Sequence, residues 1–450
     1  MLPQYVKIVT LGCPKNNVDS RQMMGYFYRQ GYQLTEDPAQ AKMILVNTCG
    51  FIEAAKRESI ETILELAQWK ENGDCEYLIV TGCLVQKYAG ELKNEIPEID
   101  LLIGTGDIPR LPEMLQALQP GKRLSCVGDP DGYLYDEGLP QVPETIKHYA
   151  YVKIAEGCDN RCTYCVIPSI RGRYRSRTME AIISEVMELA RQGVKEVILV
   201  AQDTTYYGFD LYGCFKLPEL LTKLAKIPQV VWIRLLYTYP NYITDELLQT
   251  MQREEKVCSY LDMPLQHISD RILKAMGRQP GQEETIALLT KIRMRYPDFT
   301  LRSTFIIGFP GEKEADFGKL LKFLQEFKFE RAGFFTYSKE PGTVSAALPG
   351  QVSVREKIRR LEIASKLQEG VLAAQQAKWV NRNVQIMVDG PSTDYEGLWE
   401  GRTRGDTPEI DGVVYFRPRQ SLKAGDVAGV RVTHSQEFVL MGEINHEFAK

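Results

Sequence analysis

The chain has 450 residues, of which 44% are hydrophobic and 25% charged, and its formal net charge is −4. This composition is ordinary for a soluble globular protein of two to four domains. The absence of any run of about 18 apolar residues excludes a membrane-spanning helix, and the small negative charge gives no global reason to expect nucleic-acid binding. Without the layout of a signal peptide at the start, the ten cysteines are expected in the cytoplasm, where thiols bind metals or carry out chemistry.

The N-terminal part alternates short apolar runs with amphipathic stretches. The runs predict buried parallel strands at 5–11, 43–47, 77–81 and 100–104. The stretches between them predict helices at 17–30, 53–70 and 85–94. This alternation is typical of an open α/β sheet. We therefore predict a first domain at 1–118 and a linker poor in strands at 119–148, where Pro, Gly and Asp gather.

Three cysteines in this first domain follow three of the predicted strands. Cys13, Cys49 and Cys83 are separated by 36 and 34 residues, which is the length of one strand–helix repeat. Because the carboxyl ends of parallel strands share one edge of a sheet, the three thiols are expected to converge there. Single cysteines are often buried simply as small apolar residues, but three equivalent positions indicate an iron–sulfur cluster held by three thiolates.

A second series of strand–helix repeats begins at residue 149. Strands are predicted at 151–155, 196–201, 231–236, 260–263, 301–307 and 331–335, with helices between them, as at 178–192 and 282–296, and a long charged helix at 352–379. Six repeats are too few for a closed eight-stranded barrel, so we predict a partial (β/α)6 barrel at 149–379. Sites in such folds lie at the C-terminal ends of the strands.

The loop after the first of these strands carries the string CDNRCTYC at 158–165. Its thiols, Cys158, Cys162 and Cys165, have the spacing C-x3-C-x2-C. A structural zinc knuckle is the alternative, but it needs four ligands. Since iron–sulfur clusters usually take four thiolates, three thiolates leave one iron with an open coordination position for a ligand.

From residue 380 onward the pattern changes to short strands separated by Gly, Pro and Asp. Strands are predicted at 384–388, 398–402, 412–416, 426–432 and 438–444. They predict a small five-stranded β-barrel at 380–450.

The two cysteine sets, the partial barrel and the final β-module together resemble the radical S-adenosylmethionine (SAM) methylthiotransferases, whose last domain is called TRAM. Four strings are similar to the RimO branch, which modifies an aspartate of small-subunit ribosomal protein 12: LGCPKNNVDS (11–20), NTCGFI (47–52), QDTT (202–205) and DMPLQHIS (262–269). The branch that modifies tRNA typically has GCQMN at the first cysteine, where this chain has GCPKN. Asn17 departs from the Leu that is more frequent in the family.

The resemblance implies two 4Fe–4S clusters, with SAM as both radical source and methyl donor. It implies reductive cleavage of SAM at the second cysteine set and removal of a hydrogen from Cβ of the aspartate. A methylthio group would then join that carbon from the Cys13, Cys49 and Cys83 cluster. An electron donor such as flavodoxin or ferredoxin would be needed.

Further residues are candidates for SAM binding. Tyr164 fits the aromatic position near the adenine, although ordinary loop packing is the alternative. Gln202 and Asp203 end the second barrel strand, where they could bind ribose hydroxyls or the methionine moiety. Arg234 and Arg302 could pair with the carboxylate of SAM, although arginines are more often surface residues or ion-pair partners within the protein. The segment GFPGE follows the fifth strand and could approach the adenosine through its backbone; its candidate residues are Gly308, Pro310, Gly311 and Glu312.

The substrate is judged from charge as well as from the resemblance. Residues 381–450 carry eight Lys and Arg against eleven Asp and Glu. An acidic module binds phosphates poorly but complements a basic ribosomal protein, so a nucleic-acid substrate is not expected. The dense basic run at 171–177 could contact RNA, SAM, ion-pair partners or solvent. Two alternatives remain open, a tRNA adenosine methylthiotransferase and a non-catalytic iron–sulfur protein that binds the ribosome.

Overall fold

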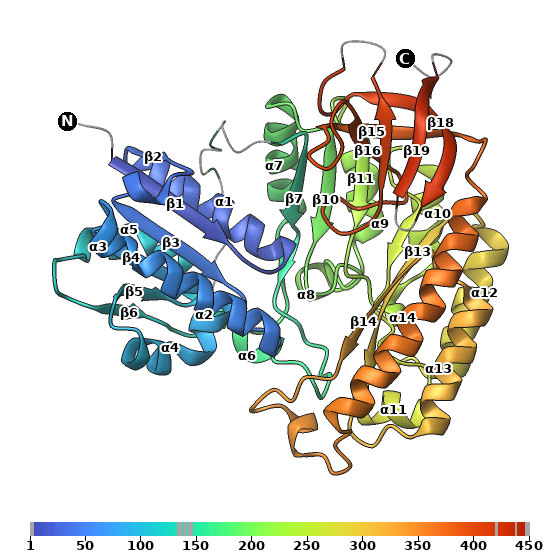
Figure 1. Ribbon diagram of the computed structural model, residues 1–450, viewed down its shortest axis with the longest axis horizontal. Coiled ribbons are helices and arrows are strands. Elements are labelled where there is room, and N and C mark those ends of the chain that lie inside the picture. The colour runs from blue at the N-terminus through green and yellow to red at the C-terminus, as the bar shows by residue number, and fades with distance from the viewer. Residues whose placement is uncertain are drawn as a thin grey trace.

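The computed structural model describes residues 4–132, 138, 142, 147–418, 422–436 and 439–445. Figure 1 shows an N-terminal α/β domain in blue beside a central barrel domain, with a C-terminal β-barrel in red above the central one. Parts of the predicted linker and the last five residues lie outside the described ranges. No helix within those ranges is long and apolar enough to cross a membrane.

The N-terminal domain is built on a six-stranded sheet in which every neighbouring pair is parallel. Its strands in spatial order are β2 (Tyr32–Leu34), β1 (Gln4–Thr10), β3 (Met43–Thr48), β4 (Tyr77–Gly82), β5 (Ile99–Ile103) and β6 (Leu124–Cys126). Its helices are α1 (Pro14–Arg29), α2 (Glu53–Ala67), α3 (Trp69–Asn72), α4 (Cys83–Glu95) and α5 (Leu111–Ala117). The open parallel sheet is confirmed.

Two short strands of this sheet were not predicted. The edge strand β2 has only three residues, too few for a periodic pattern. The other edge strand, β6, pairs with β5 and lies inside the segment predicted to be a strand-poor linker. The sheet therefore extends beyond residue 118 into that segment.

The central domain has the six predicted strands in two three-stranded parallel groups. One group is β7 (Tyr149–Lys153), β10 (Glu196–Val200) and β11 (Trp232–Leu235), and the other is β12 (Tyr260–Asp262), β13 (Thr300–Ile307) and β14 (Arg331–Thr336). Backbone hydrogen bonds of 2.8 Å join Ile233 to Lys256 and to Cys258 and so link the groups. The partial (β/α)6 barrel is confirmed.

The helices of this domain follow the strands, as Figure 1 shows. They are α6 (Ile167–Arg171), α7 (Met179–Arg191), α8 (Phe209–Tyr212), α9 (Leu217–Ala225), α10 (Asp245–Arg253), α11 (Asp270–Ala275), α12 (Gln282–Arg295), α13 (Glu314–Phe327) and α14 (Val354–Ala377). Side-chain caps begin three of them: Thr178 accepts from the Ala181 N–H ahead of α7, Thr244 from the Leu247 N–H ahead of α10, and Ser353 from the Glu356 N–H ahead of α14. A two-stranded antiparallel pair, β8 (Ala155–Glu156) and β9 (Arg175–Ser176), flanks the cysteine loop.

The C-terminal domain is a closed barrel of five strands, as predicted. Around the barrel the strands are β15 (Asn383–Pro391), β16 (Trp399–Thr403), β17 (Val413–Arg417), β19 (Val439–Asn445) and β18 (Val427–Gln436). Inward-facing residues such as Ile386, Val414 and Val430 form its small core. Closure removes the free strand edges that a short sheet would otherwise expose.

The C-terminal barrel packs on the N-terminal ends of the central strands. Arg402 contacts Glu196, the first residue of β10, at 2.6 Å, and the hydroxyl of Tyr260, the first residue of β12, donates to Asp411 at 2.6 Å. The loop with Cys158 leaves the opposite, C-terminal end of the strands. The C-terminal barrel therefore covers the end of the central barrel that is remote from this loop.

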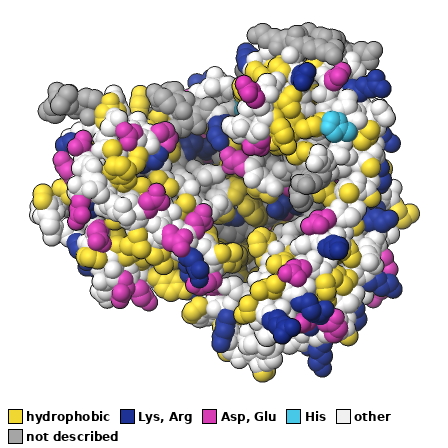
Figure 2. Space-filling model, viewed as in Figure 1, with side chains coloured by type: hydrophobic (Ala, Val, Ile, Leu, Met, Phe, Trp, Pro, Cys, Tyr) yellow, Lys and Arg dark blue, Asp and Glu magenta, His cyan; other side chains and the backbone are white. Residues whose placement is uncertain are grey.

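Ion pairs join the N-terminal domain to the central one. Glu340, which follows β14, lies 3.0 Å from the amine of Lys56 and 3.7 Å from that of Lys87. Arg21 of α1 pairs with Glu185 of α7 at 2.6 Å. Figure 2 shows that the surface is hollowed between the N-terminal domain and the other two.

Candidate functional site

The first cysteine set lies at the carboxyl edge of the N-terminal sheet, as predicted. Cys13 immediately precedes α1, Cys49 follows β3, and Cys83 is the first residue of α4. The strands that lead to them, β1, β3 and β4, are direct neighbours in the sheet. Two of the thiols therefore sit at helix N-termini, where the helix dipole favours a thiolate.

Close backbone packing around these thiols requires glycine. A Cβ on Gly12 would lie 2.6 Å from Cβ and 2.9 Å from Sγ of Cys49. Gly82 has a φ of +99°, and a Cβ there would lie 2.4 Å from the carbonyl oxygen of Thr48. Side chains at either glycine would push the cysteine-bearing segments apart.

The pKa values of the thiols show that the three cysteines affect one another. Burial raises the pKa of Cys49 to about 12, and the neighbouring Cys83 and Cys13 add to this shift. Burial also raises the pKa of Cys83, against the opposing charge of Arg171. A buried thiol of this kind ionises when a cationic centre binds it.

Backbone hydrogen bonds hold the second cysteine set in a compact loop. The Cys158 N–H donates to the Gly172 carbonyl at 3.1 Å, and the Cys165 N–H donates to the Cys162 carbonyl at 3.1 Å. Thr163 donates from its N–H to the Met276 carbonyl at 2.9 Å. The contacts of Cys158 and Thr163 hold the start and the middle of the loop against the rest of the central domain.

Burial raises the pKa of Cys158 and of Cys165 to about 12 each, with Cys162 contributing to both shifts. The guanidinium of Arg278 lies 3.8 Å from Sγ of Cys162 and 3.4 Å from the hydroxyl of Tyr164. The same guanidinium lies 4.4 Å from the ring centroid of Tyr239. No sequence pattern indicated Arg278, because it lies 113 positions after Cys165, the end of the cysteine loop.

Both cysteine sets fit a four-iron cluster in the kind and number of their donors. All six residues are free thiols. In the described part of the chain, no three His, Cys, Asp or Glu side chains are grouped as the ligands of one metal ion are. A four-iron cluster instead binds each thiolate at a different iron, so its ligands need not meet at one point.

The candidate aromatic and the glycine segment contact each other. Tyr164 is packed edge-on against Phe309, with ring centroids 6.5 Å apart. Phe309 belongs to the GFPGE segment but was not among the predicted site residues. The structure thus brings the segment of Gly308, Pro310 and Gly311 to the second cysteine loop through a side chain that the glycine pattern did not indicate.

Glu312 turns back into its own segment. Its carboxylate accepts from the Gly308 N–H at 2.8 Å and pairs with Arg360 at 2.7 Å. His267, to which no role was assigned, accepts from the N–H groups of Ile268 and Ser269 at 2.9 Å each. Glu312 therefore holds the GFPGE segment in shape, and His267 lies 3.7 Å from its carboxylate.

Gln202 and Asp203 both lie close to the second cysteine loop. Gln202 donates to Glu156 at 2.7 Å, whereas its own carbonyl oxygen is buried and accepts no hydrogen bond in the described structure. Asp203 is buried and accepts from the Asn160 amide, between Cys158 and Cys162, at 2.8 Å. Gln202 thus keeps an acceptor for a ligand, whereas Asp203 is used to hold the loop.

The two candidate arginines contact the C-terminal domain instead. Arg234 donates to Glu196 at 2.7 Å and to the carbonyl of Arg404 at 2.7 Å. Arg302 pairs with Asp262 at 2.6 Å and with Asp411 at 3.5 Å. The prediction that these arginines pair the SAM carboxylate is therefore not supported, because their charges are already used in the domain interface.

Four cysteines belong to neither set. Cys75, Cys126 and Cys258 are buried, as structural cysteines are, whereas Cys214 is exposed and contributes nothing to the core.

Three of the four arginines in the basic run at 171–177 form ion pairs within the protein. Arg171 pairs with Asp19 at 2.6 Å, Arg175 with Asp131 at 2.9 Å and Arg177 with Glu185 at 2.6 Å. Of the four alternatives left open for this run, ion pairing is the one that these contacts support.

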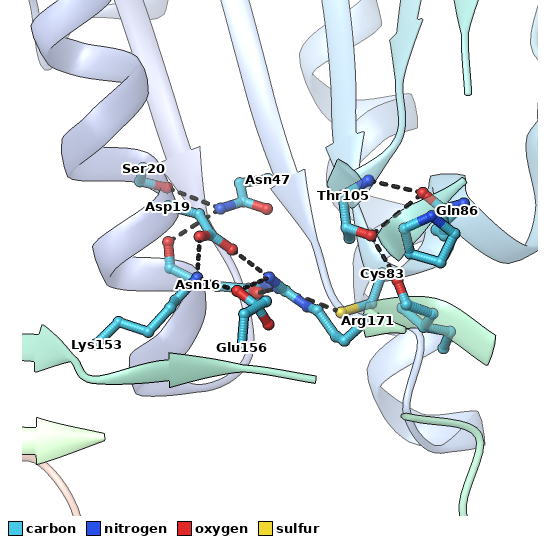
Figure 3. Close-up of polar contacts among 12 residues, drawn as sticks. Asn16, Asp19, Ser20, Asn47, Cys83, Gln86, Thr105, Lys153, Glu156 and Arg171 are labelled. Carbon is cyan, nitrogen blue, oxygen red and sulfur yellow. Dashed lines mark hydrogen bonds and ion pairs between the residues drawn. The ribbon is translucent and has the colours of Figure 1, made fainter. Parts of the chain in front are cut away.

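A buried charged network between the two cysteine sets was not predicted. Figure 3 shows Asp19 of α1 together with Lys153, Glu156 and Arg171 of the central domain. Each of the four is at most 5% exposed. The Arg171 guanidinium also lies 3.5 Å from Sγ of Cys83. Asp19 lies 134 residues before Lys153, so no local sequence pattern could have indicated the network.

Comparisons with known proteins cover the three domains. Residues 5–104 match the family described as "Uncharacterized protein family UPF0004", residues 152–324 match the radical SAM superfamily, and residues 380–444 match the TRAM domain. The chain is 49% identical to the ribosomal protein uS12 methylthiotransferase RimO of Pelotomaculum thermopropionicum, over 97% of this chain and 98% of the relative. It is 44% identical to the protein of the same name from Clostridioides difficile, over 99% of both chains.

Among solved structures, the chain resembles the radical SAM methyltransferase TsrM of Kitasatospora setae with cobalamin and a [4Fe-4S] cluster bound. The TM-score is 0.56 at 14% identity, over 94% of this chain and 84% of that one. At this identity the likeness concerns the fold alone.

Proposed function

This chain belongs to the RimO family of ribosomal protein uS12 methylthiotransferases, and we propose that it transfers a methylthio group to Cβ of an aspartate of that ribosomal protein. It is a transferase with a radical SAM domain. The observation that carries the proposal is the pairing of two three-cysteine sites on facing domains, joined through one buried network.

We propose that Cys158, Cys162 and Cys165 hold one 4Fe–4S cluster and that Cys13, Cys49 and Cys83 hold a second. When bound, the clusters and SAM supply the electron, radical, sulfur and methyl chemistry. The free thiols, and the glycines that let the cysteine-bearing segments of the first set pack closely, support this assignment. The protein's own task is to bind, orient and exclude water.

Several side chains are suited to orienting SAM. The buried carbonyl oxygen of Gln202 can accept a hydrogen bond from a ligand, and Glu156 fixes its amide nitrogen. Tyr164 and Phe309 form an apolar contact beside the second cysteine loop, where an adenine ring could pack. The backbone at Gly308, with a φ of +73°, lets that segment turn tightly next to them.

A protein substrate is favoured over tRNA by the charges of the C-terminal barrel. Arg402 and Arg404, two of its eight basic residues, are used in contacts with the central domain, to Glu196 and to backbone carbonyls of Glu255 and Val257. Phosphate binding depends on exposed Lys and Arg, so these contacts weaken a phosphate-binding role further. The acidic excess complements a basic protein.

We also propose a cytoplasmic location, since the substrate is a ribosomal protein, and a small electron carrier such as flavodoxin or ferredoxin as reductant. The second cysteine loop is the entry point for that electron, because its three residues are each partly accessible to solvent.

The test is reconstitution without oxygen, with iron, sulfide, SAM and reductant. Ribosomal protein uS12 and tRNA are offered in separate reactions and searched by mass spectrometry for hydrogen replaced by a methylthio group. We expect the modification on one aspartate of uS12 and none on tRNA. Modified tRNA adenosine would overturn the substrate assignment, and a protein that neither cleaves SAM nor modifies uS12 would favour the non-catalytic alternative.

A further inference from the structure

We propose that Arg171, at the end of α6, is a positioning residue that connects the two cysteine sites and tunes the cluster held by Cys83. The inference rests on the proposed function in that it requires a cluster at each site. Arg171 contacts Cys83 of the first cysteine set. It lies at the end of α6, the helix that follows Cys165 of the second set.

The short helix α6 connects the sites directly. It begins two residues after Cys165 and ends at Arg171, so about 6 to 8 Å of helix separates the two ends. Val166 and Ile170 form a small apolar cluster with Cys83. The carbonyl of Ile170 also accepts a hydrogen bond of 2.5 Å from the hydroxyl of Thr105 in the N-terminal domain. Figure 3 shows this contact beside Cys83.

The guanidinium of Arg171 is held in one orientation by several acceptors. It donates to Asp19 at 2.6 Å and to the side-chain oxygen of Asn16 at 2.7 Å, both in the N-terminal domain. It lies 3.5 Å from Glu156 of its own domain. Its planar group with fixed donors suits such a junction better than an ammonium group does. Only 3% of the residue is exposed.

The charges of the network balance without the thiol. Arg171 and Lys153 bring two positive charges, and Asp19 and Glu156 bring two negative ones, with Lys153 at 2.5 Å from each carboxylate. A guanidinium N–H remains directed at Sγ of Cys83, at 3.5 Å. When Cys83 is a thiolate ligand, this donor and its charge stabilise added negative charge on the cluster.

Hydrogen bonds and positive charge near cluster sulfurs favour the reduced state. Arg171 should therefore raise the reduction potential of the cluster at Cys83 and leave that of the cluster at Cys158 unchanged. Since α6 is fastened at both ends, the residue also fixes the separation between the sites. Arg171 would thus serve the reaction without touching the reacting atoms.

The test compares R171Q, R171K and E185Q in the full-length reconstituted protein. Glu185 is the matched control, because its partly buried ion pair with Arg21 also joins the two domains, and it belongs to α7 rather than to the helix that carries Arg171. Midpoint potentials of both clusters are measured by redox titration with electron paramagnetic resonance. The signal that changes on addition of SAM is assigned to the cluster at Cys158.

We expect R171Q to shift the potential of the cluster at Cys83 to more negative values and to leave the other potential unchanged. R171K keeps the positive charge, so the potential of its cluster at Cys83 should lie close to the wild-type value. This variant also provides a test if R171Q fails to fold. E185Q should lower the melting temperature without moving either potential. If the cluster at Cys83 has the same potential in R171Q and E185Q, this inference is overturned but the two-cluster proposal stands. If the wild-type protein binds only one cluster, both are overturned.

Discussion

Asn160 and Asp203 are joined by a hydrogen bond of 2.8 Å between the second cysteine loop and the end of β10. Asp203 also accepts from the hydroxyl of Thr205 at 2.6 Å. Its pKa is raised by burial, which these hydrogen bonds oppose. Asp203 was predicted to bind SAM, but its contacts assign it to holding the loop that carries Cys158 and Cys162.

Replacing Asp203 should therefore reduce iron binding at the second cysteine set more than it lowers the stability of the fold. In D203A the Asn160 amide loses its acceptor, at a cost of about 1 to 3 kcal/mol. We expect less iron bound at the second cysteine set, with the first set still filled, as measured by iron content and electron paramagnetic resonance. The control is D245N, which breaks an exposed ion pair with Lys291. Full iron content in D203A would contradict this role.

Removing Cys83 should separate the two steps of the reaction. We expect C83A to lose the iron of the first site and the methylthio product but to keep the reductive cleavage of SAM to 5′-deoxyadenosine. C75A is the matched control, since Cys75 is buried in the same domain and its sulfur lies 3.6 Å from a backbone carbonyl. Iron content and product analysis by mass spectrometry provide the measurement. Loss of SAM cleavage in C83A would show that the sites do not act separately.

Gly157 should tolerate no side chain. It has a φ of +78°, and a Cβ there would lie 1.9 Å from the Arg173 carbonyl oxygen. Gly193 is the control, because its φ is +105° but no atom lies within 4 Å of the Cβ position. G193A should lose roughly 1 to 3 kcal/mol of unfolding free energy from backbone strain alone. G157A should lose more and should also bind less iron at Cys158, measured by denaturant unfolding and iron analysis. Equal losses in both variants would contradict the steric argument.

Glu196 should stabilise the contact between the central and C-terminal domains. Its carboxylate is fully buried between Arg234 at 2.7 Å and Arg402 at 2.6 Å. E196Q leaves two buried guanidinium groups short of one negative charge, and we expect a loss of about 3 to 5 kcal/mol in denaturant unfolding. R359M, which removes exposed ion pairs with Glu314 and Glu356, should cost much less. A change of that smaller size in E196Q would contradict the prediction.

Asp316 should make the central domain sensitive to acid. Burial by itself would raise its pKa, but the Ser269 hydroxyl, the Lys313 N–H and Arg271 lower it to about 2. Because the folded pKa lies below the unfolded value of 3.8, the stabilisation is present above about pH 4 and is lost as the pH falls toward 2. It amounts to about 2 kcal/mol.

Unfolding of D316N and of the wild type at pH 2 to 7 tests this. We expect the difference in unfolding free energy to be largest near neutral pH and to fade below about pH 3. A difference that stays constant over this range would mean that the ionisation of Asp316 contributes nothing.

Local patterns predicted most of the elements. Each of the six central strands and five C-terminal strands was indicated by apolar runs whose spacing matches the strand period, and the short edge strands β2 and β6 were not, since three residues carry no period. The position of Cys13, Cys49 and Cys83 at one sheet edge also followed from the sequence. The connection lengths of parallel strands determine which loops lie together.

The sequence by itself therefore determined which thiols gather, because both sets depend on local spacing or on the regular repeat of strand and helix. The tertiary structure alone decided what surrounds them. Arg171 reaches Cys83, Arg278 reaches Cys162, and Arg234 turns to the C-terminal barrel, through contacts between residues distant in sequence. The direction of a long charged side chain depends on which buried acceptor the packed domains offer, and no sequence period encodes that choice.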